Sequence, residues 1–105
     1  MNPGIVEEVL AALADPTRRL LLDTLAARGP ATATVLAAEL PVTRQAVVKH
    51  LGVLARAGLV AGTREGREVR YSVRREPLDI TAAWMARVAE HWDARLAVIK
   101  RLAET

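Results

Sequence analysis

The chain has 105 residues, of which 51% are hydrophobic, and this is enough for one modest core, so we predict a single domain over residues 1–105. It contains no cysteine, which excludes disulfides, thiolate metal sites and cysteine redox chemistry. The formal net charge is +3, yet residues 41–75 carry eight basic and two acidic side chains, so the rest of the chain is net acidic. A basic segment between acidic ends favours binding to a polyanion.

The start of the chain is not typical of a secretory leader, because Glu7 and Glu8 lie near it and no long apolar run follows. No segment approaches the roughly 20 apolar residues of a membrane span. We therefore expect a cytoplasmic protein that makes no contact with a membrane.

Two helices are predicted in the first part of the chain. In residues 4–14 apolar side chains recur every three or four positions, the period of an amphipathic helix. A second helix is predicted over residues 16–28, because Asp15 can cap its free amides and Pro16 suits the first helical position. The apolar side chains that we expect this second helix to bury are Leu20, Leu21, Leu22, Leu25 and Ala26.

The next segment predicts a helix-turn-helix. Thr32 or Thr34 can cap a short helix, and Pro41 enforces a break after it because proline disfavours helix in the preceding residue. Thr43 then caps a further helix, which is predicted over residues 44–57 and is ended by Gly58. Two helices separated by a tight turn are typical of this motif.

Beyond the helix-turn-helix the pattern changes to that of a β-hairpin. Val69, Tyr71 and Val73 alternate with polar residues, as in a half-buried strand. The partner strand is predicted over residues 59–64, and the glycine in the connection at residues 65–68 suits a tight turn. A hairpin in this position is a wing, so the predicted fold class is mainly α with a small β-hairpin, a winged helix-turn-helix.

The last helix, predicted over residues 77–103, is long for a core helix and carries an apolar stripe. The stripe consists of Trp84, Val88, Trp92, Leu96 and Ile99. Because a lone helix of this kind needs a partner, we predict a homodimer whose two-fold interface combines the stripe with Ile5, Val9 and Leu13. The alternative is that the stripe packs on its own domain or lines an apolar pocket.

The outer face of the second helix of the helix-turn-helix supplies the candidate DNA contacts. We predict that Arg44, Gln45 and Val48 reach base edges, since arginine pairs with guanine, glutamine with adenine and an apolar group with the thymine methyl. Lys49 and His50 lie one turn further along, where contacts with phosphate are expected. His50 could equally be a partly buried side chain.

Further contacts with double-stranded DNA are predicted at the cap and in the wing. Thr43 can act as a cap, as a phosphate contact or as both. Arg64, Arg67 and Arg70 bracket the hairpin turn, and arginines at a hairpin tip suit the minor groove. The alternative is that they are solvated arginines offset by neighbouring acids. We predict no catalytic residue, because no nucleophile is paired with a base and the glycines form no phosphate loop.

Two segments carry a resemblance to a known family, ALADPTRRLLL at residues 12–22 and ELPVTRQAVVKHLGVLARAGLV at residues 39–60. They resemble the ArsR (arsenic-repressor) family of bacterial winged-helix regulators. The resemblance implies a homodimer on an operator with two half-sites, usually repressing by blocking polymerase and released by a signal. That signal, a small molecule or a protein inducer, does not follow from the resemblance.

Many members of that family sense metals, which this sequence does not favour. Their cysteines near the start of the recognition helix are replaced here by residues 41–43, and at another early ligand pair the chain has Asp79 and Thr81, of which threonine is a poor zinc ligand. The later candidate ligands, which do not restore the spacing, are Glu90, His91 and Asp93. We predict no metal and no cofactor. The alternatives are a metal-responsive repressor with a non-cysteine site and an adaptor whose basic face binds an acidic protein.

Overall fold

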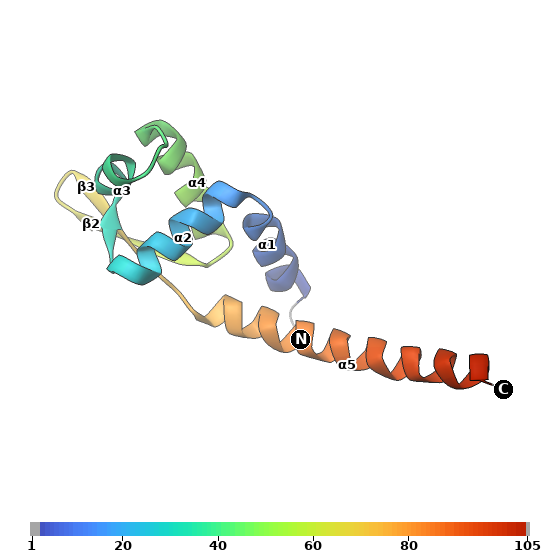
Figure 1. Cartoon of the computed structure of the whole chain (residues 1–105). Coiled ribbons are helices and arrows are strands. Elements are labelled where there is room, and N and C mark those ends of the chain that lie inside the picture. The colour runs from blue at the N-terminus through green and yellow to red at the C-terminus, as the bar shows by residue number, and fades with distance from the viewer. Residues whose placement is uncertain (1–2, 105) are drawn as a thin grey trace.

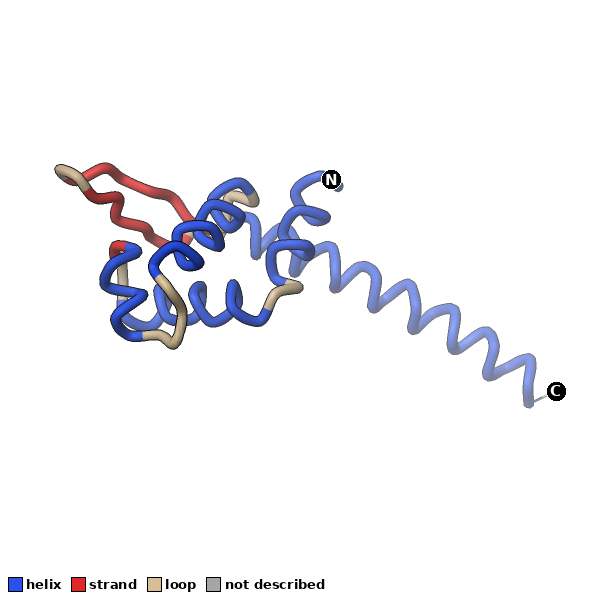
Figure 2. The backbone as a smooth tube through the Cα atoms, turned by 90° about the horizontal axis from the view of Figure 1, so that it is seen from above, coloured by secondary structure: helices blue, strands red, loops and turns tan. Residues whose placement is uncertain are grey.

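The computed structural model describes residues 3–104, so both extreme ends of the domain predicted over residues 1–105 lie outside the described residues. The elements are α1 (Pro3–Leu13), α2 (Pro16–Arg28), β1 (Ala31–Thr32), α3 (Ala33–Glu39), α4 (Arg44–Arg56), β2 (Val60–Glu65), β3 (Glu68–Val73) and α5 (Glu76–Glu104). Figures 1 and 2 show α1 to α4 and the sheet gathered into one body, from which α5 projects at the end away from the β2–β3 hairpin. This arrangement confirms the predicted winged helix-turn-helix.

The sheet contains one strand that was not predicted. Its order is β1-β3-β2 with both pairs antiparallel, and β1 pairs Ala31 with Tyr71 and Thr32 with Arg70. A strand of two residues is too short to show an alternating pattern, which explains why the sequence did not indicate it. The helix-turn-helix is thereby tied to the wing through the sheet.

The three predicted caps form as expected and set where the helices begin. Asp15 accepts hydrogen bonds from two amides of the first turn of α2, at 2.8 and 3.2 Å. Thr32, rather than Thr34, caps α3 by accepting from the amide of Val35 at 3.2 Å. Thr43 caps α4 through the amide of Ala46 at 3.1 Å. The cap at Thr43 therefore sets the residue at which the recognition helix α4 begins.

The core lies where α1 to α4 meet the base of the hairpin. Its largest fully buried side chains are Val9, Leu21, Leu25, Leu36, Val47, Leu51, Leu54 and Leu59. The predicted burial of Leu20 and Ala26 is wrong: Leu20 is 42% exposed and Ala26 also faces solvent. At about 100° per residue Leu20 lies on the side of α2 opposite the buried leucines at 21, 22 and 25, whereas Ala26 lies at the edge of the inner face, beyond Leu22.

The hairpin has a two-residue turn at Gly66 and Arg67, between the paired residues Glu65 and Glu68. Gly66 has a φ of 63°, while no residue other than glycine has a positive φ among those described. A glycine at the first turn position followed by a residue of ordinary φ is the type II′ arrangement that matches the twist of the strands. Arg67 is consequently displayed at the tip.

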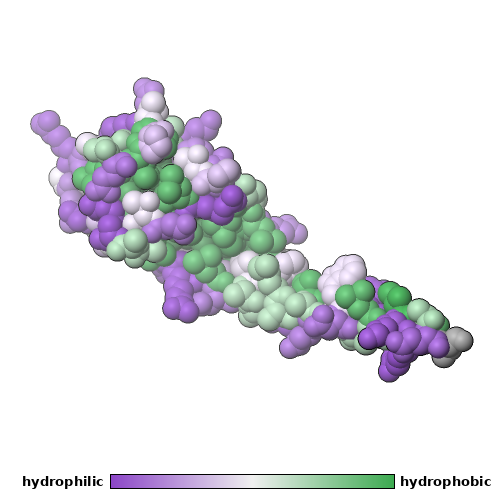
Figure 3. Space-filling model, viewed as in Figure 1, coloured by the Kyte–Doolittle hydropathy of each residue, from purple (hydrophilic) through white to green (hydrophobic). Residues whose placement is uncertain are grey.

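Only the first part of α5 packs on its own subunit. This part contacts α1, and in it Thr81 is buried and donates to the carbonyl of Pro77 at 2.8 Å, while Trp84 and Val88 are half-buried. Further along, the apolar side chains lie on the surface of the projecting rod, as Figure 3 shows. Within residues 3–104 no helix combines the length and apolarity needed to cross a membrane.

Candidate nucleic-acid interface

The recognition helix α4 presents two distinct faces. Its inner face is formed by three fully buried apolar residues, Val47, Leu51 and Leu54. On the outer face Arg44, Gln45 and Lys49 are exposed, and Val48 is 41% exposed although it is apolar. The structure therefore brings the three predicted base readers and Lys49 together on one accessible surface at the start of the helix.

Arg44 is held in place by two other elements. Its Nε donates to Thr34 Oγ1 of α3 at 3.1 Å, and that hydroxyl donates to Glu68 Oε1 of β3, also at 3.1 Å. Sequence reasoning missed both Thr34 and Glu68. The two residues are 34 positions apart in the sequence, and no local signal could have paired them, because the contact depends on how the wing folds back over α3.

A groove of about 150 Å³ separates the recognition helix from the wing. Its lining residues are Thr32, Ala33, Arg44, Val48, Arg67, Glu68, Val69 and Tyr71. Two arginines thus face a narrow depression from opposite sides, the one from α4 and the other from the hairpin tip. Although Glu68 also lines the groove, an arginine on each side allows it to accept a negatively charged backbone.

The three wing arginines do not form one cluster. Arg70 is engaged within the protein, because its Nε donates to Glu65 at 2.6 Å and Nη1 reaches the carbonyl of Pro30 at 3.5 Å. Arg64 and Arg70 lie on opposite faces of the hairpin, as their register shows. Arg64 and Arg67 are exposed, and neither has a hydrogen-bond or ion-pair partner among the described residues. The tip arginine, Arg67, is the better placed of the two for a ligand that approaches α4.

His50 lies apart from the outer face of α4. It is half-buried, and its Nδ1 is 3.5 Å from Nη1 of Arg18 in α2. Arg18 in turn donates to the carbonyls of Ala12 and Ala11, at 2.6 and 3.2 Å, and so ties the end of α1 to α2. This position agrees better with the partly buried alternative than with a phosphate contact.

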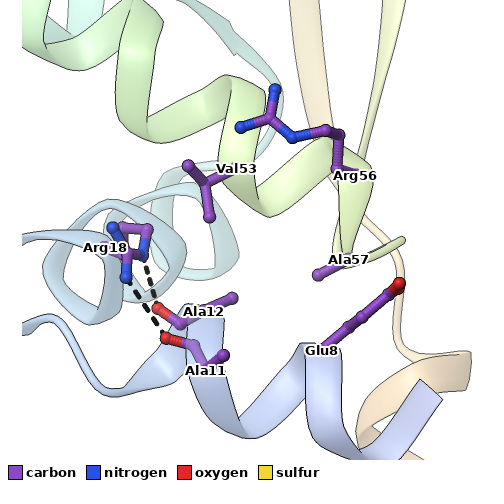
Figure 4. A pocket seen from close by; sticks show the side chains of 7 residues that line it. All are labelled: Glu8, Ala11, Ala12, Arg18, Val53, Arg56 and Ala57. Carbon is purple, nitrogen blue, oxygen red and sulfur yellow. Dashed lines mark hydrogen bonds between the residues drawn. The ribbon is translucent and has the colours of Figure 1, made fainter. Parts of the chain in front are cut away.

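A second depression, of about 370 Å³, lies behind the recognition helix between α1, α2 and α4 (Figure 4). Its floor is apolar, with Ala11, Ala12, Val53 and Ala57, and Arg56 lies at its rim. The hydrogen bonds of Arg18 across its wall are already satisfied by main-chain carbonyls. The depression contains no paired nucleophile and base.

The residues predicted at the dimer interface fall into three groups. Val9 is completely buried in the core of its own subunit, so it has no surface left for a partner and its assignment to the interface is corrected. Four are half-buried, namely Ile5, Leu13, Trp84 and Val88. The remaining three are largely exposed, Trp92 at 57%, Leu96 at 56% and Ile99 at 60%.

Comparison with known proteins identifies the class. A family model described as a helix-turn-helix domain matches residues 13–63. The chain is 38% identical over 89 residues to the HTH-type transcriptional regulator YuzN of Bacillus subtilis, covering 78% of this chain and 97% of that one. It is 31% identical to the transcriptional repressor SdpR of the same organism, covering 76% of this chain and 88% of that one.

Among solved structures, an ArsR-like transcriptional regulator from Rhodococcus sp. RHA1 superimposes with a TM-score of 0.85 and 42% identity, covering 97% of this chain and 95% of that one. The fold, the exposed basic helix beside a wing and these relatives define a winged helix-turn-helix transcriptional regulator, a class that binds DNA and is not enzymatic. Within this class, the chain belongs to the ArsR family, as the two motifs in the sequence indicated.

Proposed function

We propose that the protein binds, as a homodimer, a two-fold operator in double-stranded DNA and represses transcription without a metal ion. The observation that carries the proposal is the outer face of α4, which exposes Arg44, Gln45 and Val48 beside the wing arginine Arg67. In a helix-turn-helix these first residues of the recognition helix meet base edges in the major groove. Repression is favoured because SdpR, which is similar along most of its length, is named a transcriptional repressor.

The homodimer is supported by the exposed apolar stripe of α5. Trp92, Leu96 and Ile99 lie on the projecting half of the helix, and large apolar side chains gathered on one surface mark an interaction site. A second copy of the chain offers the same stripe, so a two-fold pairing covers both. Pairing through α5 would place two recognition helices on one duplex, as a two-fold operator requires.

Metal independence is supported by the chemistry of the candidate ligands. Asp79, at the early position of the ligand pair, accepts from Nε of Arg75 at 3.0 Å. Across residues 3–104 no three His, Cys, Asp or Glu side chains converge within the subunit. A zinc site needs about four such ligands.

The test is fluorescence anisotropy with the duplex upstream of the gene against a scrambled duplex, in a salt series, with and without added zinc. We expect a preference for the upstream duplex, unaffected by zinc, and an affinity that falls by about 0.9 log units per log unit of salt for each neutralised phosphate. Absence of any preference at every salt concentration would favour the adaptor that binds an acidic protein. A change of affinity with zinc would favour a metal-responsive repressor.

Single substitutions separate base reading from charge. Arg44→Ala or Gln45→Ala should cost about 1–3 kcal/mol of binding free energy on the operator and relax the preference at one position of each half-site. The matched control is Arg101→Ala, which removes the same charge from the far end of α5. If Arg44→Ala weakened binding to operator and scrambled duplex equally, Arg44 would be a phosphate contact.

A further inference from the structure

We propose that Thr34 and Glu68 are positioning residues that hold the guanidinium of Arg44 for end-on recognition of a guanine in each operator half-site. The inference rests on the proposed function, since it concerns how the proposed base reader is oriented. It starts from the chain of two hydrogen bonds that joins α4 to α3 and α3 to the wing, each 3.1 Å long.

Only the terminal N–H donors of Arg44 remain available for DNA. An arginine has five N–H donors in one plane, one on Nε and two on each Nη. The Nε of Arg44 donates to Thr34, whereas its two Nη groups have no partner among the described residues. The pair of Nη donors at the end of the fork is complementary to two acceptors side by side. Guanine presents two such acceptors in the major groove, O6 and N7, whereas adenine presents an acceptor beside a donor.

Glu68 orients the hydroxyl group of Thr34. The hydroxyl of Thr34 has a single hydrogen, which points to Glu68 Oε1, so its lone pairs are left for Nε of Arg44. The carboxylate of Glu65, the residue paired with Glu68 across the hairpin, is engaged by Arg70. Glu65 is therefore paired with Arg70 and Glu68 with Thr34. By accepting the hydrogen of the Thr34 hydroxyl, Glu68 turns the lone pairs of that oxygen toward Nε of Arg44.

Holding the guanidinium of Arg44 in place before DNA binds lowers the entropic cost of the contact. A free arginine side chain samples many rotamers, and fixing it on a base costs entropy that a preformed orientation avoids. The two linked hydrogen bonds also restrict the angle of the guanidinium plane of Arg44, and a bidentate contact with a base depends on that angle. Loss of the Thr34 hydroxyl should therefore reduce discrimination at the base facing Arg44 more than it reduces general affinity for DNA.

The experiment measures anisotropy with the operator and with a set of duplexes in which each guanine of the half-sites is changed in turn to adenine. We expect the wild-type protein to lose about tenfold or more in affinity at one guanine, and Arg44→Ala to remove that difference. Thr34→Val should reduce the ratio of affinities for guanine over adenine at that position by about fivefold. The salt slope should not change, because no charge is altered. Thr34→Ser, which keeps the hydroxyl, should retain the ratio of the wild type.

Substitutions of Glu68 separate its acceptor role from its charge. Glu68→Gln keeps an acceptor oxygen for Thr34, so discrimination at the guanine should persist while affinity for scrambled duplex rises by about two- to fivefold, since a negative charge has left the interface. Glu68→Ala removes the acceptor and should lose discrimination as well. The matched controls are Thr24→Val and Asp23→Asn on α2, where the hydroxyl of Thr24 donates to the carbonyl of Leu20.

The outcomes distinguish this inference from the proposed function. If Thr34→Val, folded by circular dichroism, discriminates at every position as the wild type does, the positioning role is overturned while operator binding stands. If Arg44→Ala loses as much affinity as the wild type at every changed guanine, the assignment of Arg44 to a guanine is overturned. If the wild type shows no preference for any duplex, both the inference and the proposed function fail.

Discussion

Gly62 of β2 has no side chain because the hairpin has no room for one. It is paired with Tyr71 of β3, and a Cβ built at this position would lie 2.7 Å from Cγ1 of Val69 and 3.3 Å from Cε1 of Tyr71. Valine is stiff at χ1, so it cannot easily move aside. The aromatic ring instead packs beside the bare backbone of the neighbouring strand.

We expect Gly62→Ala to lower the free energy of unfolding by about 1–3 kcal/mol through overpacking. Thermal unfolding followed by circular dichroism should show a decrease of several degrees in the midpoint. The control is Gly4→Ala, because no atom lies within 4 Å of a Cβ at Gly4 and alanine favours the helix. Equal midpoints for Gly62→Ala and the wild type would contradict this account.

For single residues, the sequence predicts helix caps and exposure better than it predicts contacts between side chains that are far apart in the sequence. The caps at Asp15 and Thr43 follow from residue type and position, and so does the exposure of Arg44 on the outer face of α4. The engagement of Arg70 by Glu65 and the contact of Thr34 with Glu68 do not follow, because they depend on the register and twist of the hairpin. No pattern in a single sequence encodes these.

At the scale of elements, α2 begins on a carboxylate that is held in its ionised form. The amide of Arg18, and then that of Thr17, donate hydrogen bonds to Asp15, and together with the Arg18 guanidinium they lower the pKa of Asp15 below its ordinary value. A folded-state pKa below the unfolded one means that ionisation favours folding. This stabilisation is fully present above the unfolded pKa, about 3.9, and is lost as the pH falls through the lower, folded pKa.

Asp15→Ala should therefore lower stability at pH 7, and its difference from the wild type should shrink below about pH 4. Asp15→Asn keeps a capping oxygen but cannot titrate. It should remove the contribution of Asp15 to the pH dependence of stability, with a smaller loss of stability at pH 7 than Asp15→Ala. Urea unfolding followed by circular dichroism at pH 7, 5 and 3 measures both. A difference between wild type and Asp15→Ala that stays constant over this range would show that ionisation of the cap does not contribute.

Elements of ordinary length were predicted to within one residue, whereas the shortest strand was not predicted at all. The apolar periods, the caps and the two glycines that end α2 and α4 suffice for the helices and the hairpin. The strand β1 consists of Ala31 and Thr32 and exists only because β3 offers a free edge beside it. Its formation depends on the tertiary structure, which local sequence patterns do not indicate.

At the scale of the whole molecule, the projecting half of α5 supports the proposed homodimer. The subunit measures 68 × 28 × 20 Å because half of α5 stands clear of the body. We expect the wild type to sediment as a dimer. Leu96→Glu places a charge in the middle of the exposed stripe, and we expect this variant to sediment as a monomer at the same concentrations. Analytical ultracentrifugation across a concentration series measures this directly.

The matched control is Ala94→Glu, which adds the same charge on the opposite face of α5. It should leave the dimer intact, and circular dichroism should show that both variants keep their helical content. A Leu96→Glu dimer as stable as that of the wild type would place the two-fold interface elsewhere. Trp92→Ala should weaken the dimer in the same assay, because it removes a large part of the exposed apolar surface.

The way in which two copies of α5 pair would determine the distance between the two recognition helices of the proposed dimer. The 29 residues of α5 span about 43 Å at 1.5 Å per residue, and sliding one copy past the other by a single turn would shift the two recognition helices by about 5.4 Å. That shift corresponds to about one and a half base pairs, which also rotates one half-site around the DNA axis. In the proposed dimer, the distance between half-sites would thus be set by Trp92, Leu96 and Ile99, which lie at the opposite end of the molecule from the proposed base readers.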